Sequence, residues 1–245
     1  MSIRYIARCI VLYIRRGFTE DKRSTVFSIA LSIILTIVVV ANMAREISEI
    51  PPEGIAYVGN LYVLTLGATI GFLASVTTSS TASVYHQDRV SHFIEVILST
   101  PLTPKTYIDS ITVASIINSI ISYTAIAVVY TAISTSIAST TARQILFSHW
   151  IYIVALLMTI LTSLLSIAMN IIATRLSIDP SRLAILPSTA IFLTAILIPN
   201  ILGIKTLANE HLYTFITTLG ATCLALIIAI EIMAKRLAGE YLITW

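Results

Sequence analysis

Charged residues are scarce in this chain of 245 residues: they form 11% of the sequence, whereas hydrophobic residues form 57%. A soluble globular domain usually has about a quarter of its residues charged. A chain this poor in charge cannot cover a water-facing surface, so much of it must face lipid. Long Ile, Leu, Val and Ala runs favour helices, which satisfy their own backbone groups in a bilayer. The composition predicts an all-α integral membrane protein.

Several chemical signatures are lacking as well. Cys9 and Cys223 match neither a disulfide framework nor a metal-ligand spacing, and are interpreted as small apolar side chains. No His, Asp and Glu cluster has the spacing of a metal site, and no G-x-x-x-x-G-K-[ST] phosphate loop is present. The interiors of the apolar runs contain no ionisable residue, which disfavours proton or sodium coupling. We therefore expect no catalytic, metal or cofactor site in this chain.

Six apolar runs are candidates for transmembrane helices, since roughly 20 residues cross a hydrocarbon core of about 30 Å. The fifth run is the shortest. The second and third are longer than a membrane needs, so we expect them to project beyond it, tilt or break. The six runs are 24–43, 55–85, 105–134, 150–172, 183–198 and 211–233.

The distribution of basic residues indicates how the chain is oriented in the membrane. With six spans, one side of the membrane holds twelve of the fifteen Lys and Arg residues, and the other holds only Arg45, Arg143 and Lys205. This positive-inside bias predicts cytoplasmic termini and a multi-pass topology. The net charge of +3 follows from that topology rather than from nucleic-acid binding, because no basic-aromatic patch is present.

The first 23 residues predict an amphipathic helix at the membrane interface. Arg4, Arg8 and Arg15 recur at near-helical spacing on a polar stripe, and isoleucines mostly occupy the other side. Such a helix can direct its arginines toward anionic head groups of membrane lipids. Two interpretations stay open: a charged anchor that sets topology, and a docking surface for a cytoplasmic partner.

Small and polar residues within the runs have two interpretations, which are tight helix packing and the lining of a weakly polar translocation path. In the second run, the candidates for either role are Gly67, Gly71, Ser75 and Thr78. Asparagine is costly in lipid, so it should face protein or a cavity. The asparagine candidates are Asn60, Asn118 and Asn170.

The stretch "DRVSHFIEVILSTPLTPK", which begins at Asp88, separates the second run from the third. Its apolar residues share one helical face. They are Val90, Phe93, Ile94, Ile97 and Leu98. Pro101 should stop this helix, because proline lacks an amide hydrogen. Thr103 and Pro104 predict the start of the next helix, with threonine as the N-cap and proline in the first turn.

This pattern resembles that of the membrane subunit (permease) of type-2 ATP-binding-cassette (ABC) transporters, E-R-E-x-G-T-x-E-x-L-L-x-T-P-L, which lies between spans two and three. Here Asp88-Arg89 matches the acid-arginine pair, Glu95 the internal glutamate and Thr100-Pro101-Leu102 the terminal triplet. The chain departs from the pattern at Val90 and at His92-Phe93, where the family usually has a second acid and Gly-Thr.

The resemblance implies six spans, cytoplasmic termini and a coupling helix, here 88–100, that docks on a separate ATPase subunit. In that arrangement Asp88, Arg89 and Glu95 would pair with charges on the partner. ATP and Mg would be bound by that partner, and two permeases, as a homodimer or heterodimer, would form the pathway.

The resemblance also implies a re-entrant external gate between the fifth and sixth spans, for which the candidates are Pro199, Asn200 and Gly203. It further implies export of a lipidic, glycan, drug-like or peptide substrate across a prokaryotic plasma membrane. Two alternatives stay open, an ATP-independent channel or carrier and a membrane scaffold or assembly factor.

Overall fold

The computed structural model describes residues 3–19, 22–90, 103–175 and 208–243. These residues are almost entirely helical, and no strand occurs among them. The helices are α1 (Ile3–Thr19), α2 (Lys22–Glu49), α3 (Pro52–Val90), α5 (Pro104–Ile137), α6 (Thr140–Leu146), α7 (His149–Arg175) and α9 (Asn209–Ile243).

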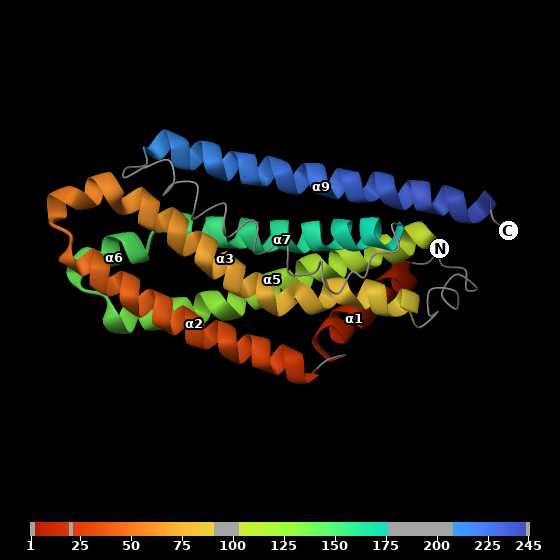
Figure 1. Ribbon diagram of the computed structural model, residues 1–245, viewed down its shortest axis with the longest axis horizontal. Coiled ribbons are helices and arrows are strands. Elements are labelled where there is room, and N and C mark those ends of the chain that lie inside the picture. Colours follow the sequence, from red (N-terminus) through yellow and green to blue (C-terminus); the bar gives the residue numbers. More distant parts are fainter. Residues whose placement is uncertain (1–2, 20–21, 91–102, 176–207, 244–245) are drawn as a thin grey trace.

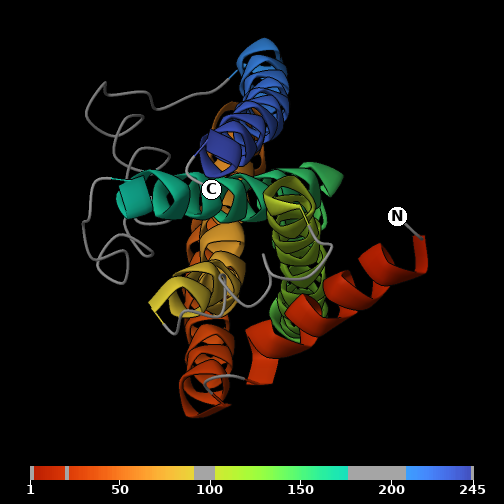
Figure 2. The same ribbon diagram turned by 90° about the vertical axis from the view of Figure 1, so that its right-hand side faces the viewer.

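In the described part of the chain, the long helices run along the long axis of the molecule, and α1 lies across one end of them (Figure 1 and Figure 2). These long helices are α2, α3, α5, α7 and α9. Among the described residues, five helical segments are long and apolar enough to cross a membrane. They are Thr25–Glu49, Val58–Val76, Lys105–Ile137, Ala142–Ile172 and Asn209–Arg236. Five of the six expected runs therefore coincide with long apolar helices. The fifth run, 183–198, lies outside the described residues.

The helices extend beyond the apolar runs that predicted them. The clearest case is α3, which continues through Asp88 to Val90. A separate helix beginning at Asp88 was therefore the wrong boundary. Hydropathy marks only the lipid-compatible part of a helix, and no proline or glycine occurs between Gly71 and Val90 to end it.

The start of α5 confirms the interpretation of Thr103 and Pro104. Thr103 has an extended backbone and is the N-cap, and its hydroxyl accepts a hydrogen bond from the Thr106 backbone N–H. Pro104 occupies the first turn. The proline ring presets the helical φ, and the threonine satisfies one of the free N–H groups at the helix end.

The segment between α5 and α7 contains the short helix α6. Ser139 caps α6 by accepting a hydrogen bond from the Ala142 N–H. The hydroxyl of Tyr130 in α5 then donates to the carbonyl of Leu146 at 2.6 Å. Since Tyr130 and Leu146 are both fully buried, α6 packs into the end of the bundle instead of projecting from it.

Helices α7 and α9 run in the same direction. The rings of Trp150 and Tyr213, one near the start of each helix, lie 5.0 Å apart in an edge-to-face contact. Farther along, the thiol of Cys223 points to the Leu157 carbonyl. The end of α7 and the start of α9 therefore lie at opposite ends of the bundle (Figure 1).

The central contact of the bundle joins α3 and α7. A Cβ atom placed on Gly67 would lie 2.8 Å from Cβ of Val154, and one on Gly71 would lie 2.7 Å from Cβ of Met158. The Thr159 hydroxyl also reaches the carbonyl of Gly71 at 3.3 Å. The small residues thus bring the two backbones close together, as is typical of membrane helix pairs.

Helices α2 and α9 lie at opposite edges of the bundle (Figure 1), and much of their apolar surface is uncovered. Val26 and Phe27 of α2 are 66% and 67% exposed, and Leu224 of α9 is 64% exposed. Such a surface is unfavourable in water and is suited to lipid.

Candidate functional site

The polar stretch predicted from the sequence lies where α3 ends and α5 begins. We call the described residues at this place, Asp88–Val90 and Thr103–Asp109, the α3–α5 junction. It lies at the end of the bundle where α1 crosses and where the C-terminal part of α9 lies (Figure 1). Two groups of polar side chains connect the junction to these helices.

The first group, which we call the Asp88 node, consists of Asp88, Arg16, Tyr13 and Tyr107. Nη1 of Arg16 lies 2.6 Å from Oδ1 of Asp88. The Tyr107 hydroxyl donates to Oδ2 of Asp88 at 2.9 Å, and the Tyr13 hydroxyl donates to the same oxygen at 3.3 Å. The carboxylate therefore joins α1, α3 and α5.

The Asp88 side chain is completely inaccessible, and Arg16 is 21% exposed. Removing a carboxylate from water costs several kcal/mol, so burial requires an opposite charge and hydrogen bonds. Arg16 supplies the charge, and the two tyrosines supply donors. Burial, followed by the proximity of Asp88, raises the pKa of Tyr13, so this phenol remains protonated as a donor.

The rings of the node hold the ion pair in place. Tyr13 and Tyr107 meet edge to face with centroids 5.7 Å apart, and the Arg16 guanidinium lies 5.7 Å from the centre of the Tyr13 ring. Both contacts are favourable arrangements for aromatic and cationic groups. Nearby, the Asn118 side chain reaches the carbonyl of Ile14 at 3.5 Å, which adds another connection between α5 and α1.

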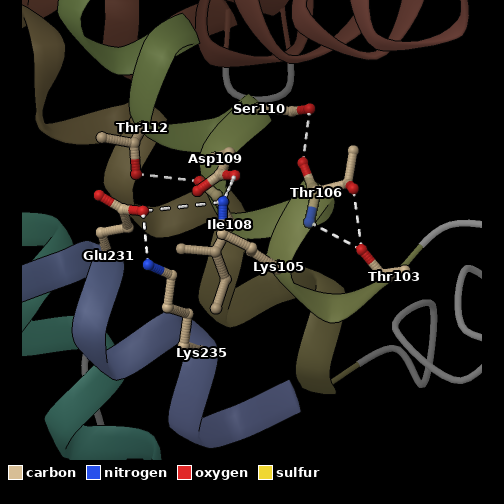
Figure 3. Close-up of polar contacts among 9 residues, drawn as sticks. All are labelled: Thr103, Lys105, Thr106, Ile108, Asp109, Ser110, Thr112, Glu231 and Lys235. Carbon is tan, nitrogen blue, oxygen red and sulfur yellow. Dashed lines mark hydrogen bonds and ion pairs between the residues drawn. The ribbon is translucent and has the colours of Figure 1, made fainter. Parts of the chain in front are cut away.

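The second group, which we call the Lys105 ladder, connects α5 to α9 through alternating charges (Figure 3). Nζ of Lys105 lies 3.1 Å from Asp109 in the next turn of α5 and 3.9 Å from Glu231 of α9. Glu231 in turn lies 3.0 Å from Nζ of Lys235. All four side chains are between 40% and 61% exposed, so these pairs are weaker than the buried pair in the Asp88 node.

The burial of Asp88 corrects one expectation. A carboxylate with no accessible surface is not placed to form a surface ion pair with another subunit, and in this chain it has partners of its own. Arg89 and Val90 are the last residues of α3, and their side chains are outside the described set. The remaining predicted interface residues also lie outside it: Phe93, Ile94, Glu95, Ile97, Leu98 and Pro101.

The polar residues of the spans mostly take part in helix contacts. Gly67 and Gly71 bring α3 close to α7, and the Ser75 hydroxyl donates to the Phe72 carbonyl of its own helix. Asn60 donates to the Asn209 side chain at 2.8 Å, which links α3 to α9. These contacts favour packing over the lining of a path.

Buried asparagines show the same behaviour. Asn118 and Asn170 are 1% and 2% exposed, and Asn170 donates to the Ser166 carbonyl one turn earlier in α7. The side chain of Thr78 is outside the described set, as are the gate candidates Pro199, Asn200 and Gly203.

The arginines of the N-terminal helix separate into two groups. Arg8 and Arg15 are exposed, whereas Arg16 turns into the Asp88 node. The side chain of Arg4 is outside the described set. The expected amphipathic helix is present, with its inner face held against α3 and α5.

Neither protein-family models, nor curated proteins, nor solved structures gave a match to this chain. Among the described residues, no group of three or more His, Cys, Asp and Glu side chains is arranged to hold a metal ion. The site is therefore interpreted from its own geometry.

Sequence reasoning missed Tyr13, Arg16 and Tyr107 as partners of Asp88. A tyrosine three residues before an arginine places both on one side of α1, which was a local signal for a polar spot on that face. No local pattern indicated that this spot would meet the end of α3, because the contact joins distant parts of the chain.

Proposed function

We propose that this chain is the membrane-spanning subunit of an ABC transporter and that a separate subunit supplies the ATPase. One observation carries the proposal: the acid-arginine to Thr-Pro-Leu pattern that begins at Asp88 connects two helices, α3 and α5, that are long and apolar enough to cross a membrane. A motif that receives mechanical input must connect directly to such helices.

The contacts of the α3–α5 junction support this role. A displacement at the end of α3 would be transmitted to α1 through Arg16 and Asp88. A displacement at the start of α5 would be transmitted to α9 through Lys105 and Glu231. Contiguous ion pairs and packed rings are the kind of contact that carries such coupling.

In the proposed mechanism, the partner subunits bind ATP and Mg and close on each other. The segment 88–100 receives this closure and moves the spans of two permeases, identical or related, around a shared pathway. The substrate class we propose is a lipidic, glycan, drug-like or peptide molecule exported across a prokaryotic plasma membrane. Pro199, Asn200 and Gly203 would belong to an external gate.

The proposal is tested by purifying the tagged chain from its native membrane and assaying the copurified proteins for ATP hydrolysis. We expect an ATPase to copurify with the wild type and to be lost from a Phe93→Asp/Ile97→Asp variant. A matched control, Ile137→Asp/Phe147→Asp, changes two exposed apolar residues far from the segment 88–100 and should keep the ATPase. Ile137 is the last residue of α5, and Phe147 follows α6.

Transport by the purified chain alone, with no ATPase present, would contradict the proposal and indicate a channel or carrier. Equal recovery of the ATPase with the Phe93→Asp/Ile97→Asp variant would contradict the assignment of the coupling segment.

A further inference from the structure

We propose that the outer face of α1 is a binding surface for anionic phospholipid. The face consists of Arg8, Val11, Leu12 and Arg15, which follow one another at spacings of three, one and three residues and so share one side of the helix. This proposal goes beyond the transport function and does not depend on it.

The composition of the outer face suits a membrane surface. Arg8 and Arg15 are exposed, and between them Val11 and Leu12 are 64% and 46% exposed. Apolar side chains flanked by arginines fit the boundary of a bilayer, where the chains enter the acyl region and the guanidinium groups reach the phosphates. The sequence of α1 contains no Asp or Glu that would repel such a headgroup.

Helix α1 lies across the direction of the other long helices. In Figure 2 it is seen close to its full length, whereas the other long helices are foreshortened. A helix that lies crosswise at the end of membrane-crossing helices is parallel to the membrane surface. Its length therefore follows the headgroup layer.

The opposite face of α1 is already occupied by contacts with the bundle. Tyr13 is 3% exposed and Arg16 pairs with Asp88, so the inner side is committed to the bundle and cannot turn toward lipid. Close to the same end, Val26 and Phe27 at the start of α2 continue the exposed apolar surface. The inner contacts thus fix which face of α1 meets the membrane.

The test uses the purified full chain in a neutral detergent, titrated with dioleoyl phosphatidylglycerol or dioleoyl phosphatidylcholine. The rise in the thermal unfolding midpoint gives an apparent affinity for each lipid. We expect the wild type to prefer the anionic lipid. Since each basic residue near an anionic surface contributes about fivefold in affinity, the Arg8→Gln/Arg15→Gln variant should lose roughly 30-fold of that preference.

Two further variants make the result decisive. Arg45→Gln/Arg143→Gln removes the same charge from exposed positions at the far end and should keep the preference. Arg8→Lys/Arg15→Lys keeps the charge and should also keep it. An equal loss in the far-end variant would show a general charge effect and overturn the proposal. An unchanged preference in Arg8→Gln/Arg15→Gln would also overturn the proposal. It would indicate that this face binds an acidic protein partner instead of lipid.

Discussion

Arg16 and Asp88 form an ion pair of 2.6 Å that fixes the N-terminal helix to the last turn of α3. The carboxylate is fully enclosed, so the pair contributes through the avoided cost of an isolated buried charge rather than through net attraction alone. The pair also makes α1 part of the bundle. A change in the position of α1 must therefore also displace the end of α3.

Replacing Arg16 by Met should be strongly destabilising, because Asp88 would then be buried without an opposite charge. The expected cost is about 3–5 kcal/mol, which corresponds to a fall of roughly 10 °C in the thermal unfolding midpoint in detergent. The neighbouring substitution Arg15→Gln, at an exposed position, is the matched control and should change the midpoint little. Equal effects of the two substitutions would contradict the assigned ion pair.

The pH dependence of stability should change when Tyr13 is replaced by Phe. Burial raises the pKa of Tyr13, so the folded state keeps its proton above pH 10, where a free tyrosine ionises. This contribution to stability is complete below about pH 10 and is lost as the pH rises further. Between pH 9 and 11, the unfolding free energy of the wild type should fall more steeply than that of Tyr13→Phe, by at most about 1.4 kcal/mol per pH unit. Parallel profiles would show that Tyr13 is not enclosed.

Adding a methyl group at the α3–α7 contact should destabilise the bundle. Gly67→Ala and Gly71→Ala each place Cβ within 2.8 Å of an atom of α7, which forces the helices apart at a cost of about 1–3 kcal/mol. Gly220→Ala in α9 meets nothing within 4 Å and is the control. It should be neutral or slightly stabilising, since alanine favours helix over glycine. Unfolding midpoints of the three variants provide the measurement.

Breaking the Lys105 ladder should have a much smaller effect on stability than breaking the Asp88 node. Glu231→Gln removes a partner of both Lys105 and Lys235, but these groups are partly exposed and water can replace the lost contacts. The unfolding midpoint of Glu231→Gln should lie close to that of the wild type, and that of Asp88→Asn well below it. A lower midpoint for Glu231→Gln than for Asp88→Asn would contradict this prediction. It would show that the α5–α9 connection contributes more to stability than the Asp88 node.

The features that the sequence predicted best depend on local chemistry. Apolar runs marked the centres of five long helices because lipid requires continuous apolar helix. Thr103 and Pro104 marked the start of α5 because a cap and an N-terminal proline act within one turn.

The features that were missed either lack a local apolar signal or depend on contacts between distant residues. The end of α3 was placed too early because its polar last turns continue the helix without an apolar signal. The burial of Asp88 was not foreseen, since it arises only when α1 brings Tyr13 and Arg16 to the end of α3 and α5 brings Tyr107. The short helix α6 was missed because seven residues are too few to show periodicity.

The close approach of α3 and α7 limits how the protein can change shape. At Gly67 and Gly71 the backbone of α3 lies so close to Val154 and Met158 that sliding by one residue would drive a side chain into α7. The two helices should therefore move as one rigid body. Any conformational change must then occur by rotation of the peripheral helices, above all α2 and α9, about this fixed pair.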